Sequence, residues 1–444
     1  MNETLFELPP TEPPATAEAG TGKPRLVRPN RGQVAMHLAA LDDLLPAEHL
    51  ARVIWGLVEP LDLSALYAPI RAVDGHAGHP AIDPAVLVAL WLYATAEGVG
   101  SARALDRLCR EHLAYQWLCG GVSVNYHTLA DFRVTHERAL DALLTQQVAA
   151  LMAAGLVSLA RTAQDGVRIR ASAGSSSFRR RARLEQFQAE AQARVEQLKT
   201  QAGTDDAQHT ARQQAAQARA ARERLARVQQ ALQELVQLEQ TQAKSHQKKS
   251  KRKPPRSSTS DPQARVMQMP DGGHRPAYNG QVAVDTASGL IVGVDVTNQI
   301  DRGQLEPMRQ QLQARYGRSP HEHLVDGGFV AHADIEASAT AGVTLYAPLP
   351  ATRATAPPAE QSRSKAGPGV RAWWARMETD AAKAIYKLRA QTVEWANAGL
   401  RQRGLYQVRV RGQAKVRAVL LWFALIHNLL RGRALQATAT AASG

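Results

Sequence analysis

The feature that most constrains this chain is a change in the spacing of its apolar residues near Arg161. Before that point, from residue 33 to about 155, apolar side chains recur at helical spacing. From Arg161 the segment RTAQDGVRIRAS alternates apolar side chains around a glycine, which predicts a β-strand. Later strand patterns, in part separated by helical segments, occur at 281–285, 291–297, 323–326 and 343–347. The sequence therefore predicts an all-helical region followed by a mixed α/β core.

The charge balance points to a polyanionic partner. The chain has 54 Lys and Arg against 40 Asp and Glu, a net charge of +14 over 444 residues. Such an excess favours contact with phosphates and release of counterions, so nucleic acid is the first partner to consider. Charge that only keeps the protein soluble explains the same number equally well.

Cysteine usage and the first residues bear on the compartment. Two cysteines are too few for a disulfide framework or a four-cysteine zinc site, which fits a reducing compartment. The acidic, Pro-rich start has no signal-peptide pattern, so a cytoplasmic protein is expected. Apolar runs such as 86–94 and 419–426 are shorter than the roughly 18 to 20 residues that span a bilayer, and we expect buried helices and no membrane partner.

The first region contains four predicted helices, at 47–57, 84–96, 102–113 and 129–152. Asp83-Pro84 places a proline at a first helical position, while Ser101 and Thr128 have side chains suited to capping backbone amides. A helical unit in a basic protein can place one helix in the major groove of DNA, but most helical bundles bind no DNA. Both alternatives stay open for this region.

A long Ala, Gln, Glu and Arg rich segment, 181–243, interrupts the α/β pattern. Leu225, Val228, Leu232, Leu235 and Leu238 follow helical spacing, and 203–206 supplies a breaker, so a helical hairpin inserted into the core is expected. The hairpin is followed by a basic run, KKSKRKPPRSS at 248–258. Its residues Lys251, Arg252 and Lys253 suit a DNA backbone, and a solvated linker is an equal alternative.

The remaining boundaries follow from composition. Residues 1–32 are expected to be a disordered arm and 434–444 a disordered tail. Between them lie a helical domain at 33–155 and an α/β domain at 156–433. The second is interrupted by the hairpin and basic linker at 179–256 and by a Pro and Ala rich loop at 351–370. One long helix is predicted from 371 to 403, and an apolar helix from 416 to 430 is expected to close the core.

Two aspartates suggest metal-dependent phosphodiester chemistry. Such chemistry uses carboxylates that hold a pair of divalent ions roughly 4 Å apart, and magnesium prefers oxygen ligands. Asp165 in AQDGV and Asp326 in LVDGGF stand where strands are expected to end, and each precedes a glycine that allows close approach. Taken singly, an Asp-Gly pair more often marks an ordinary turn.

The third acid is expected from the helical segment YKLRAQTVEWANAGLRQRGL. On a regular helix Lys387, Glu394, Asn397 and Arg401 share a face, so Glu394 would bind metal while Lys387 and Arg401 contact DNA phosphates. A surface Glu in paired charges is the alternative. Other acids compete less well: Glu378 precedes a helix start capped by Thr379, and Asp285 and Asp295 suit turns or strand edges.

The order Asp165, Asp326, then Glu394 after the pair Tyr386 and Arg389 resembles the DDE transposases of bacterial insertion sequences. More of the chain, over about 33–432, resembles one subgroup with a long helical insert after the first core strand. The matching segments are LDDLLPAEHLAR, DPAVLVALWLYATAEGVGSARALDRLC, HTLADFR, SDPQARVM, RPAYNGQVAVDT and VRGQAKVRAVLLWFALIHNLLR.

The resemblance implies a ribonuclease H-like α/β core, a mixed sheet flanked by helices, with the helical DNA-binding domain before it. It gives Asp165, Asp326 and Glu394 catalytic, metal-binding roles with Mg²⁺, or Mn²⁺ in its place. Tyr386, Arg389 and Arg401 then contact DNA near the reacting phosphate.

Three departures from the family pattern weaken the supporting roles. Val167 replaces a common threonine, Arg401 replaces a lysine, and one extra residue separates Arg389 from Glu394.

Trp395, beside Glu394, has a ring able to stack on an unpaired base, and core packing is the alternative for it and for Trp373 and Trp374. The histidines show no metal-ligand spacing, with His321 and His323 the nearest pair.

The predicted function is a transposase that binds its terminal inverted repeats, cleaves DNA and transfers the strand, acting as a dimer or larger assembly on DNA. A transposase-derived regulator that binds DNA without cutting it is the main alternative, and a nuclease of branched DNA is a third.

Overall fold

The computed structural model describes residues 39–72, 80–201, 211–244, 253–349 and 366–443. Residues 41–444 form one compact unit, and residues 1–40 are assigned to another that lies almost wholly outside the described residues. The predicted arm at 1–32 therefore falls outside them. The described residues on both sides of the predicted boundary near 155 belong to the same compact unit.

The first region is helical, as predicted. Its elements are η1 (Leu41–Leu44), α1 (Leu50–Val58), α2 (Ser64–Tyr67), α3 (Pro84–Ala96), α4 (Ala102–Glu111), α5 (Leu113–Cys119), α6 (Tyr126–Thr135) and α7 (Glu137–Ala153). Helix α3 has the predicted bounds and is buried on nearly every side, so it forms the centre of this region.

The observed capping residues agree with the predicted ones at two helix starts and differ at a third. Asp83 accepts a hydrogen bond from the Ala85 amide, and Ser101 accepts one from the Ala104 amide. Thr128 is not a cap, because the Asn125 side chain accepts from the Thr128 amide and begins α6 three residues earlier. The helix predicted at 129–152 is two helices, which meet at His136.

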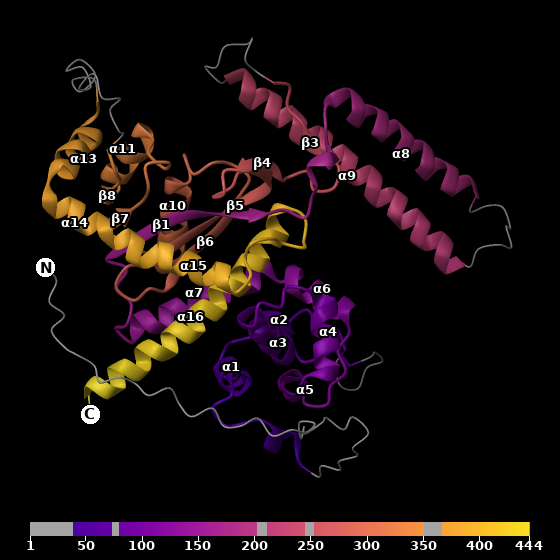
Figure 1. Cartoon of the computed structure of the whole chain (residues 1–444), viewed down its shortest axis with the longest axis horizontal. Coiled ribbons are helices and arrows are strands. Elements are labelled where there is room, and N and C mark those ends of the chain that lie inside the picture. Colours follow the sequence, from indigo (N-terminus) through magenta and orange to yellow (C-terminus); the bar gives the residue numbers. More distant parts are fainter. Residues whose placement is uncertain (1–38, 73–79, 202–210, 245–252, 350–365, 444) are drawn as a thin grey trace, which may run out of the picture. The chain divides into compact units, whose positions relative to one another are not determined.

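A mixed six-stranded sheet forms the second region. Its strands are β1 (Arg161–Arg170), β4 (Arg265–Gln268), β5 (His274–Asp285), β6 (Ile291–Thr297), β7 (Glu322–Leu324) and β8 (Thr344–Tyr346). The path is β4-β5-β1-β7-β8, and β6 also pairs with β5. Strand β5 is antiparallel to β1, β4 and β6, whereas β7 and β8 run parallel to β1. An α/β fold is therefore confirmed, with β1 and β5 at its centre (Figure 1).

Strand β5 is longer than the sequence pattern indicated. Only 281–285 was predicted, but β5 begins at His274 and is continuously buried from Pro276 onward. Because both faces are covered, the alternation that marks a half-exposed strand is absent from its first half. Helix α10 (Leu305–Tyr316) packs on β6, and α11 (His332–Thr340) packs on β8.

The inserted segment forms the expected pair of helices, α8 (Arg181–Gln201) and α9 (Ala211–Lys244), which pack on each other. They share a small apolar cluster of Leu184, Ala231 and Leu235. At the base of the pair, β2 (Phe178–Arg179) and β3 (Ser257–Ser258) form a separate two-stranded ladder. The predicted breaker at 203–206 lies outside the described residues.

The prediction of one uninterrupted helix from 371 to 403 is wrong. The chain forms α13 (Pro368–Glu378), α14 (Asp380–Arg389), a π-helical turn η4 (Ala390–Glu394) and α15 (Trp395–Gln402). The break between α13 and α14 occurs at Thr379, whose backbone is extended. The Thr379 side chain accepts a hydrogen bond from the Ala382 amide and so caps the start of α14. Of the predicted loop at 351–370, residues 351–365 lie outside the described residues, and residues 368–370 belong to α13, so the loop ends earlier than predicted.

The last helix, α16 (Gln413–Ser443), joins the two regions. It packs against α3, α6 and α7 on one side and against β5 and β6 on the other (Figure 1). The Asn428 side chain donates to the Ile291 carbonyl and accepts from the Ile291 amide, which fastens α16 to β6. The helix continues to Ser443, so the described residues of the predicted tail at 434–444 are helical.

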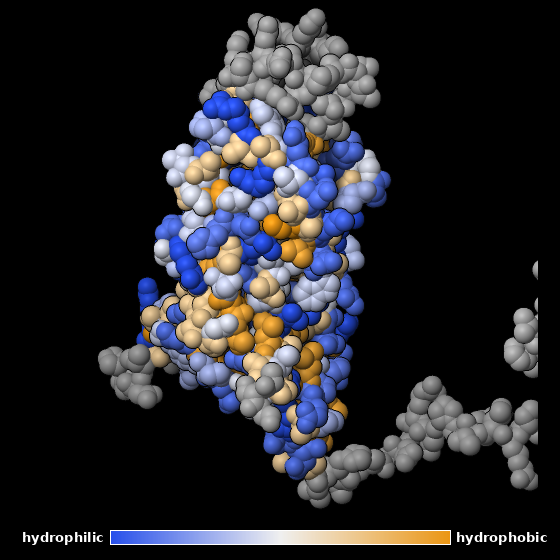
Figure 2. Space-filling model, turned by 90° about the vertical axis from the view of Figure 1, so that its left-hand side faces the viewer, coloured by the Kyte–Doolittle hydropathy of each residue, from blue (hydrophilic) through white to orange (hydrophobic). Residues whose placement is uncertain are grey.

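Helix α16 is long and apolar enough, by length and composition, to cross a membrane. Its apolar window is 72% buried inside the protein, which is what a core helix of this length shows. Figure 2 presents one face of the molecule, on which hydrophilic residues are interspersed with smaller hydrophobic patches.

Buried His323 makes the stability of the sheet depend on pH. It lies on β7 between the Thr162 hydroxyl, 2.6 Å from Nδ1, and the Gln164 side-chain oxygen, 3.1 Å from Nε2. Burial lowers the pKa of His323 to about 4, so below pH 6.5 the unfolded chain binds a proton that the folded chain does not. The free energy of unfolding should fall by about 2 kcal/mol from this group between pH 7.5 and 4.5.

Replacing His323 with Gln keeps one donor and one acceptor and removes the titration. We expect urea unfolding of His323→Gln to show a pH dependence weaker than wild type by that amount, and exposed His321→Gln to match wild type. Equal pH dependence in all three proteins would contradict the assignment.

Candidate active site

The register of two parallel strands brings Asp165 and Asp326 together. Strands β1 and β7 pair in parallel with Ala163 opposite Leu324. Asp165 and Asp326 each lie two residues beyond this pair, so the two aspartates lie at the same level along the two chains. The expectation that Asp165 ends a strand is wrong: β1 continues to Arg170 against β5, and only β7 ends before its aspartate.

The guanidinium of Arg389 joins all three predicted acids. Its Nη2 lies 2.7 Å from Asp165 Oδ1 and 4.0 Å from Asp326 Oδ2, and its Nη1 lies 2.7 Å from Glu394 Oε1. The Arg389 side chain is only 9% exposed, whereas Asp326 is 40% and Glu394 51% exposed. A strand, a post-strand loop and a helix thus place three carboxylates around one buried cation.

The π-helical turn η4 accounts for the extra residue between Arg389 and Glu394. In a regular α-helix, residues four apart share a face and residues five apart do not. A π turn takes up one additional residue without changing the direction of the helix. Because η4 spans Ala390–Glu394, Glu394 returns to the face of Arg389 and its carboxylate accepts from the guanidinium.

The π-helical turn also determines which residue of α14 lies on the same helix face as Glu394. The prediction that Lys387 shares it assumed a regular helix and is wrong, because η4 shifts the preceding residues by one position. Lys387 is exposed, and Tyr386 takes its place. Burial raises the pKa of the Tyr386 hydroxyl, and the charges of Asp326, Glu394 and Asp165 raise it further against the opposing effect of Arg389.

Asp165 is the most enclosed of the three acids, with its side chain 19% exposed. Burial raises its pKa, although Arg389, the Gly166 amide and the Asn397 amide group favour the charged form. Asn397, on α15, donates to Asp165 Oδ2 at 3.0 Å, and the Gly166 amide donates to Oδ1 at 2.9 Å. Both oxygens of Asp165 are therefore held in place.

Asp301 is a neighbour of this site that the sequence did not reveal. Its carboxylate pairs with Arg168 on β1 and accepts from the side chains of Asn279 and Gln281 on β5. Burial raises the pKa of Asp301, but these donors outweigh it and the pKa is lowered. Asp301 packs directly against Gly166, where a Cβ would collide with it. It lies in a polar loop with no periodic pattern, so nothing in the sequence linked it to Asp165.

The competing acids lie in other settings. Asp285 accepts from the amide and hydroxyl of Ser288 in a turn, and Asp295 pairs with Arg417 at 3.2 Å, in agreement with the turn and strand-edge roles predicted for them. Glu378 is exposed at the end of α13, and Arg389 pairs with Glu394 instead.

The tryptophans differ in exposure. Trp395 is 52% exposed, with His427 packed edge-on and Arg431 over its ring. Trp373 is fully buried and donates to the Ala347 carbonyl, as core packing requires.

A groove of about 610 Å³ begins beside the acids. Its lining includes Gly166, Arg168, His274, Ile300 and Arg401. Arg401 is half-buried and lines this groove together with Gly166, the residue that follows Asp165. Of the predicted basic run, Lys253 is exposed, while Lys251 and Arg252 lie outside the described residues.

In this structure the carboxylates hold Arg389. Within the described ranges, no group of three or more His, Cys, Asp or Glu side chains is arranged to hold a metal ion. Carboxylate oxygens are nevertheless ligands that magnesium prefers, and three of them already surround a cation.

Deletion of Gln391 should be tolerated, because it turns η4 into a regular turn and leaves Arg389 and Glu394 four residues apart. We expect the free energy of unfolding to change by less than about 1 kcal/mol. Deletion of exposed Ala384 in α14 has no extra residue to absorb it, rotates buried Ala382, and should cost about 3 kcal/mol. Chemical unfolding of both proteins tests this, and equal losses would argue against the π turn.

Gly166→Ala should lower the free energy of unfolding by about 1 to 3 kcal/mol, because the new methyl group collides with Asp301 and Asn279. Gly56→Ala is a matched control, because Gly56 lies in α1 and a Cβ there meets open space. This substitution should raise the free energy of unfolding by roughly 0.5 to 1 kcal/mol. Thermal unfolding of the two variants should move in opposite directions, and a neutral Gly166→Ala would be inconsistent with the described packing.

Comparison with known proteins gives one match. Residues 39–135, from the start of the helical region to the end of α6, match a family model described as "Transposase domain (DUF772)". No curated protein and no solved structure matches the chain. The match does not reach the three acids. It supports a transposase family for the chain, and with it an enzyme that acts on DNA.

Proposed function

We propose that this chain is a DDE transposase with a ribonuclease H-like catalytic core. It binds the terminal inverted repeats of its insertion sequence, cleaves the DNA strand, and joins the freed end to target DNA. One observation carries the proposal: Asp165, Asp326 and Glu394 come from separate elements and meet at Arg389, in a chain whose first region matches a transposase domain.

The acid cluster is difficult to explain as a purely structural feature. Three carboxylates around one guanidinium leave an excess of negative charge, and mutual repulsion disfavours such a group. Asp326 and Glu394 are open to solvent, so the excess charge faces the position where a ligand can arrive. The mixed sheet with flanking helices is also the arrangement that a ribonuclease H-like core requires.

The donor set fits magnesium, with manganese as a substitute. Asp165, Asp326 and Glu394 would hold the metal, and when bound it supplies charge neutralisation at the phosphate and activation of the attacking oxygen. The protein's own contribution is orientation. Asn397 and the Gly166 amide fix both oxygens of Asp165, and η4 sets the direction of Glu394.

The surrounding cations suit the DNA backbone. We infer that Arg389 and Arg401 contact phosphates near the reacting group, since a guanidinium offers two parallel donors to a phosphate. Tyr386 lies within electrostatic reach of all three acids and would contact the same region. The groove lined by Gly166 and Arg401 would hold one DNA strand. The exposed ring of Trp395 would stack on an unpaired base at the end of the transposon DNA. Exposed Lys387 and the basic residues 251–253 would make further phosphate contacts.

The helical region, which includes residues 39–135, would recognise the terminal repeats. Cutting and joining must be coordinated between two ends, so a homodimer or larger assembly on DNA follows from the proposal. The working compartment would be the bacterial cytoplasm, on the nucleoid.

The proposal is tested by incubating the full chain with magnesium and DNA that carries the inverted repeats flanking its reading frame. We expect nicks at the repeat ends. Asp165→Asn, Asp326→Asn and Glu394→Gln should each lower the rate by more than the roughly tenfold to hundredfold that loss of a metal's outer partners costs. Glu378→Gln, at the competing acid, should retain the wild-type rate.

Three outcomes would contradict this assignment. Repeat-specific binding without magnesium-dependent nicking favours a DNA-binding regulator. Cutting of branched DNA without preference for the ends favours a repair nuclease. Unchanged cutting by Asp326→Asn, or loss of cutting in Glu378→Gln alone, would mean that the acids have been assigned wrongly.

A further inference from the structure

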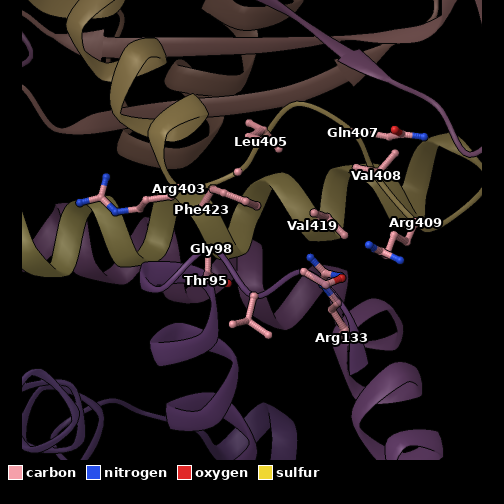
Figure 3. A pocket seen from close by; sticks show the side chains of 13 residues that line it. Thr95, Gly98, Arg133, Arg403, Leu405, Gln407, Val408, Arg409, Val419 and Phe423 are labelled. Atoms are coloured by element: carbon pink, nitrogen blue, oxygen red, sulfur yellow. The ribbon is translucent and has the colours of Figure 1, made fainter. Parts of the chain in front are cut away.

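A separate cavity of about 150 Å³ lies where the helical region meets the turn between α15 and α16. One wall is the α3–α4 connection with Gly98 and Gly100, together with Arg133 on α6 (Figure 3). The opposite wall is the segment 403–409, and α16 contributes Val419 and Phe423. The walls approach closely at two glycines of positive φ, Gly98 and Gly404. A Cβ on Gly98 would lie 3.5 Å from the Arg403 carbonyl oxygen, and a Cβ on Gly404 would lie 3.6 Å from the Gly98 carbonyl oxygen.

Arg133 is almost completely enclosed, with 7% of its surface exposed. Its Nη1 donates to the Gly100 carbonyl at 2.7 Å, and its guanidinium carbon lies 4.5 Å from the centre of the Trp91 ring. Its Nε is buried without a hydrogen-bond partner in the protein. No carboxylate in the described part of the chain pairs with Arg133, which leaves a buried positive charge without a counterion.

A second arginine faces the first. Arg409 is exposed at the cavity mouth, and Figure 3 shows its side chain and that of Arg133 directed toward one another from opposite walls. Burial lowers the pKa of Arg133 to about 10, and the charge of Arg409 contributes. The residues that line the cavity include no acid. Two like charges across a small cavity repel each other unless an anion lies between them.

A purely structural role explains only part of this arrangement. The Gly100 carbonyl and the Trp91 ring account for the position of Arg133, as carbonyl and cation–π contacts do in many cores. They do not account for the unpartnered Nε or for a second cation at the mouth. An oxyanion bound in the cavity neutralises both charges.

We propose that this cavity binds a phosphate group between Arg133 and Arg409. Arg133 would donate from the enclosed end and Arg409 from the mouth, which is open enough for a group attached to a larger molecule. The ligand is a free phosphate or a phosphate of a DNA backbone. This inference goes beyond the proposed function, because the site lies outside the acid cluster and its occupancy does not require strand cleavage.

The test uses the full chain without magnesium, so that strand cleavage does not contribute. Inorganic phosphate is titrated by calorimetry at constant ionic strength, with chloride as the balancing anion. In a second arm, a fluorescent DNA duplex is titrated by anisotropy at several salt concentrations. The variants are Arg409→Gln, which changes an exposed residue, and Arg133→Gln, which changes the enclosed one. Arg411→Gln is the matched control, because Arg411 is exposed, lies two residues away and donates instead to the Ser172 carbonyl.

If the ligand is free phosphate, wild type and Arg411→Gln bind it, and both Arg409→Gln and Arg133→Gln weaken binding about tenfold or more. If the ligand is a backbone phosphate, inorganic phosphate gives no signal. Arg409→Gln then weakens duplex binding and lowers the slope of log K against log salt by about one, while Arg411→Gln leaves both unchanged.

The proposal is overturned if neither phosphate nor duplex binding distinguishes Arg409→Gln from Arg411→Gln. Because Arg409→Gln alters only an exposed side chain, this comparison holds even if Arg133→Gln does not fold.

Discussion

The candidate site depends on one guanidinium that satisfies three carboxylates. Arg389 lies at the end of α14, almost fully buried, and its two terminal nitrogens contact acids from β1, from the loop after β7 and from η4. Without this cation, Asp165 would be a buried charge opposed only by the dipoles of Asn397 and the Gly166 amide. The pair of Arg389 and Asp165 therefore fastens the helical segment to the central strand of the sheet.

Much of the fold could be predicted from the sequence, because local patterns and tertiary burial agree there. The bounds of α3 follow from an apolar run that starts at Asp83-Pro84, those of β6 follow from a strand pattern, and Asp83 and Ser101 cap as expected. The pattern failed where burial or tertiary contacts override periodicity. Strand β5 is buried on both faces from Pro276 onward, and Asn125 rather than Thr128 begins α6.

The candidate site was predicted in its residues but not in its geometry. Asp165, Asp326 and Glu394 carry motif information, whereas their meeting depends on the parallel register of β1 and β7, which no local pattern encodes. The π turn was visible only as an extra residue between Arg389 and Glu394, and assuming a regular helix placed Lys387 where Tyr386 lies. Asp301 could not be found, because it meets Gly166 from a loop more than a hundred residues away in the chain.

Helix α16 has a consequence for how the chain reaches its native state. It supplies packing for α3, α6 and α7 and also covers β5 and β6, so both regions share their last layer. During synthesis, the N-terminal helices and the sheet leave the ribosome with these faces uncovered. Neither core is complete until residues 413–443 have emerged, so we expect the two regions to reach their native packing together.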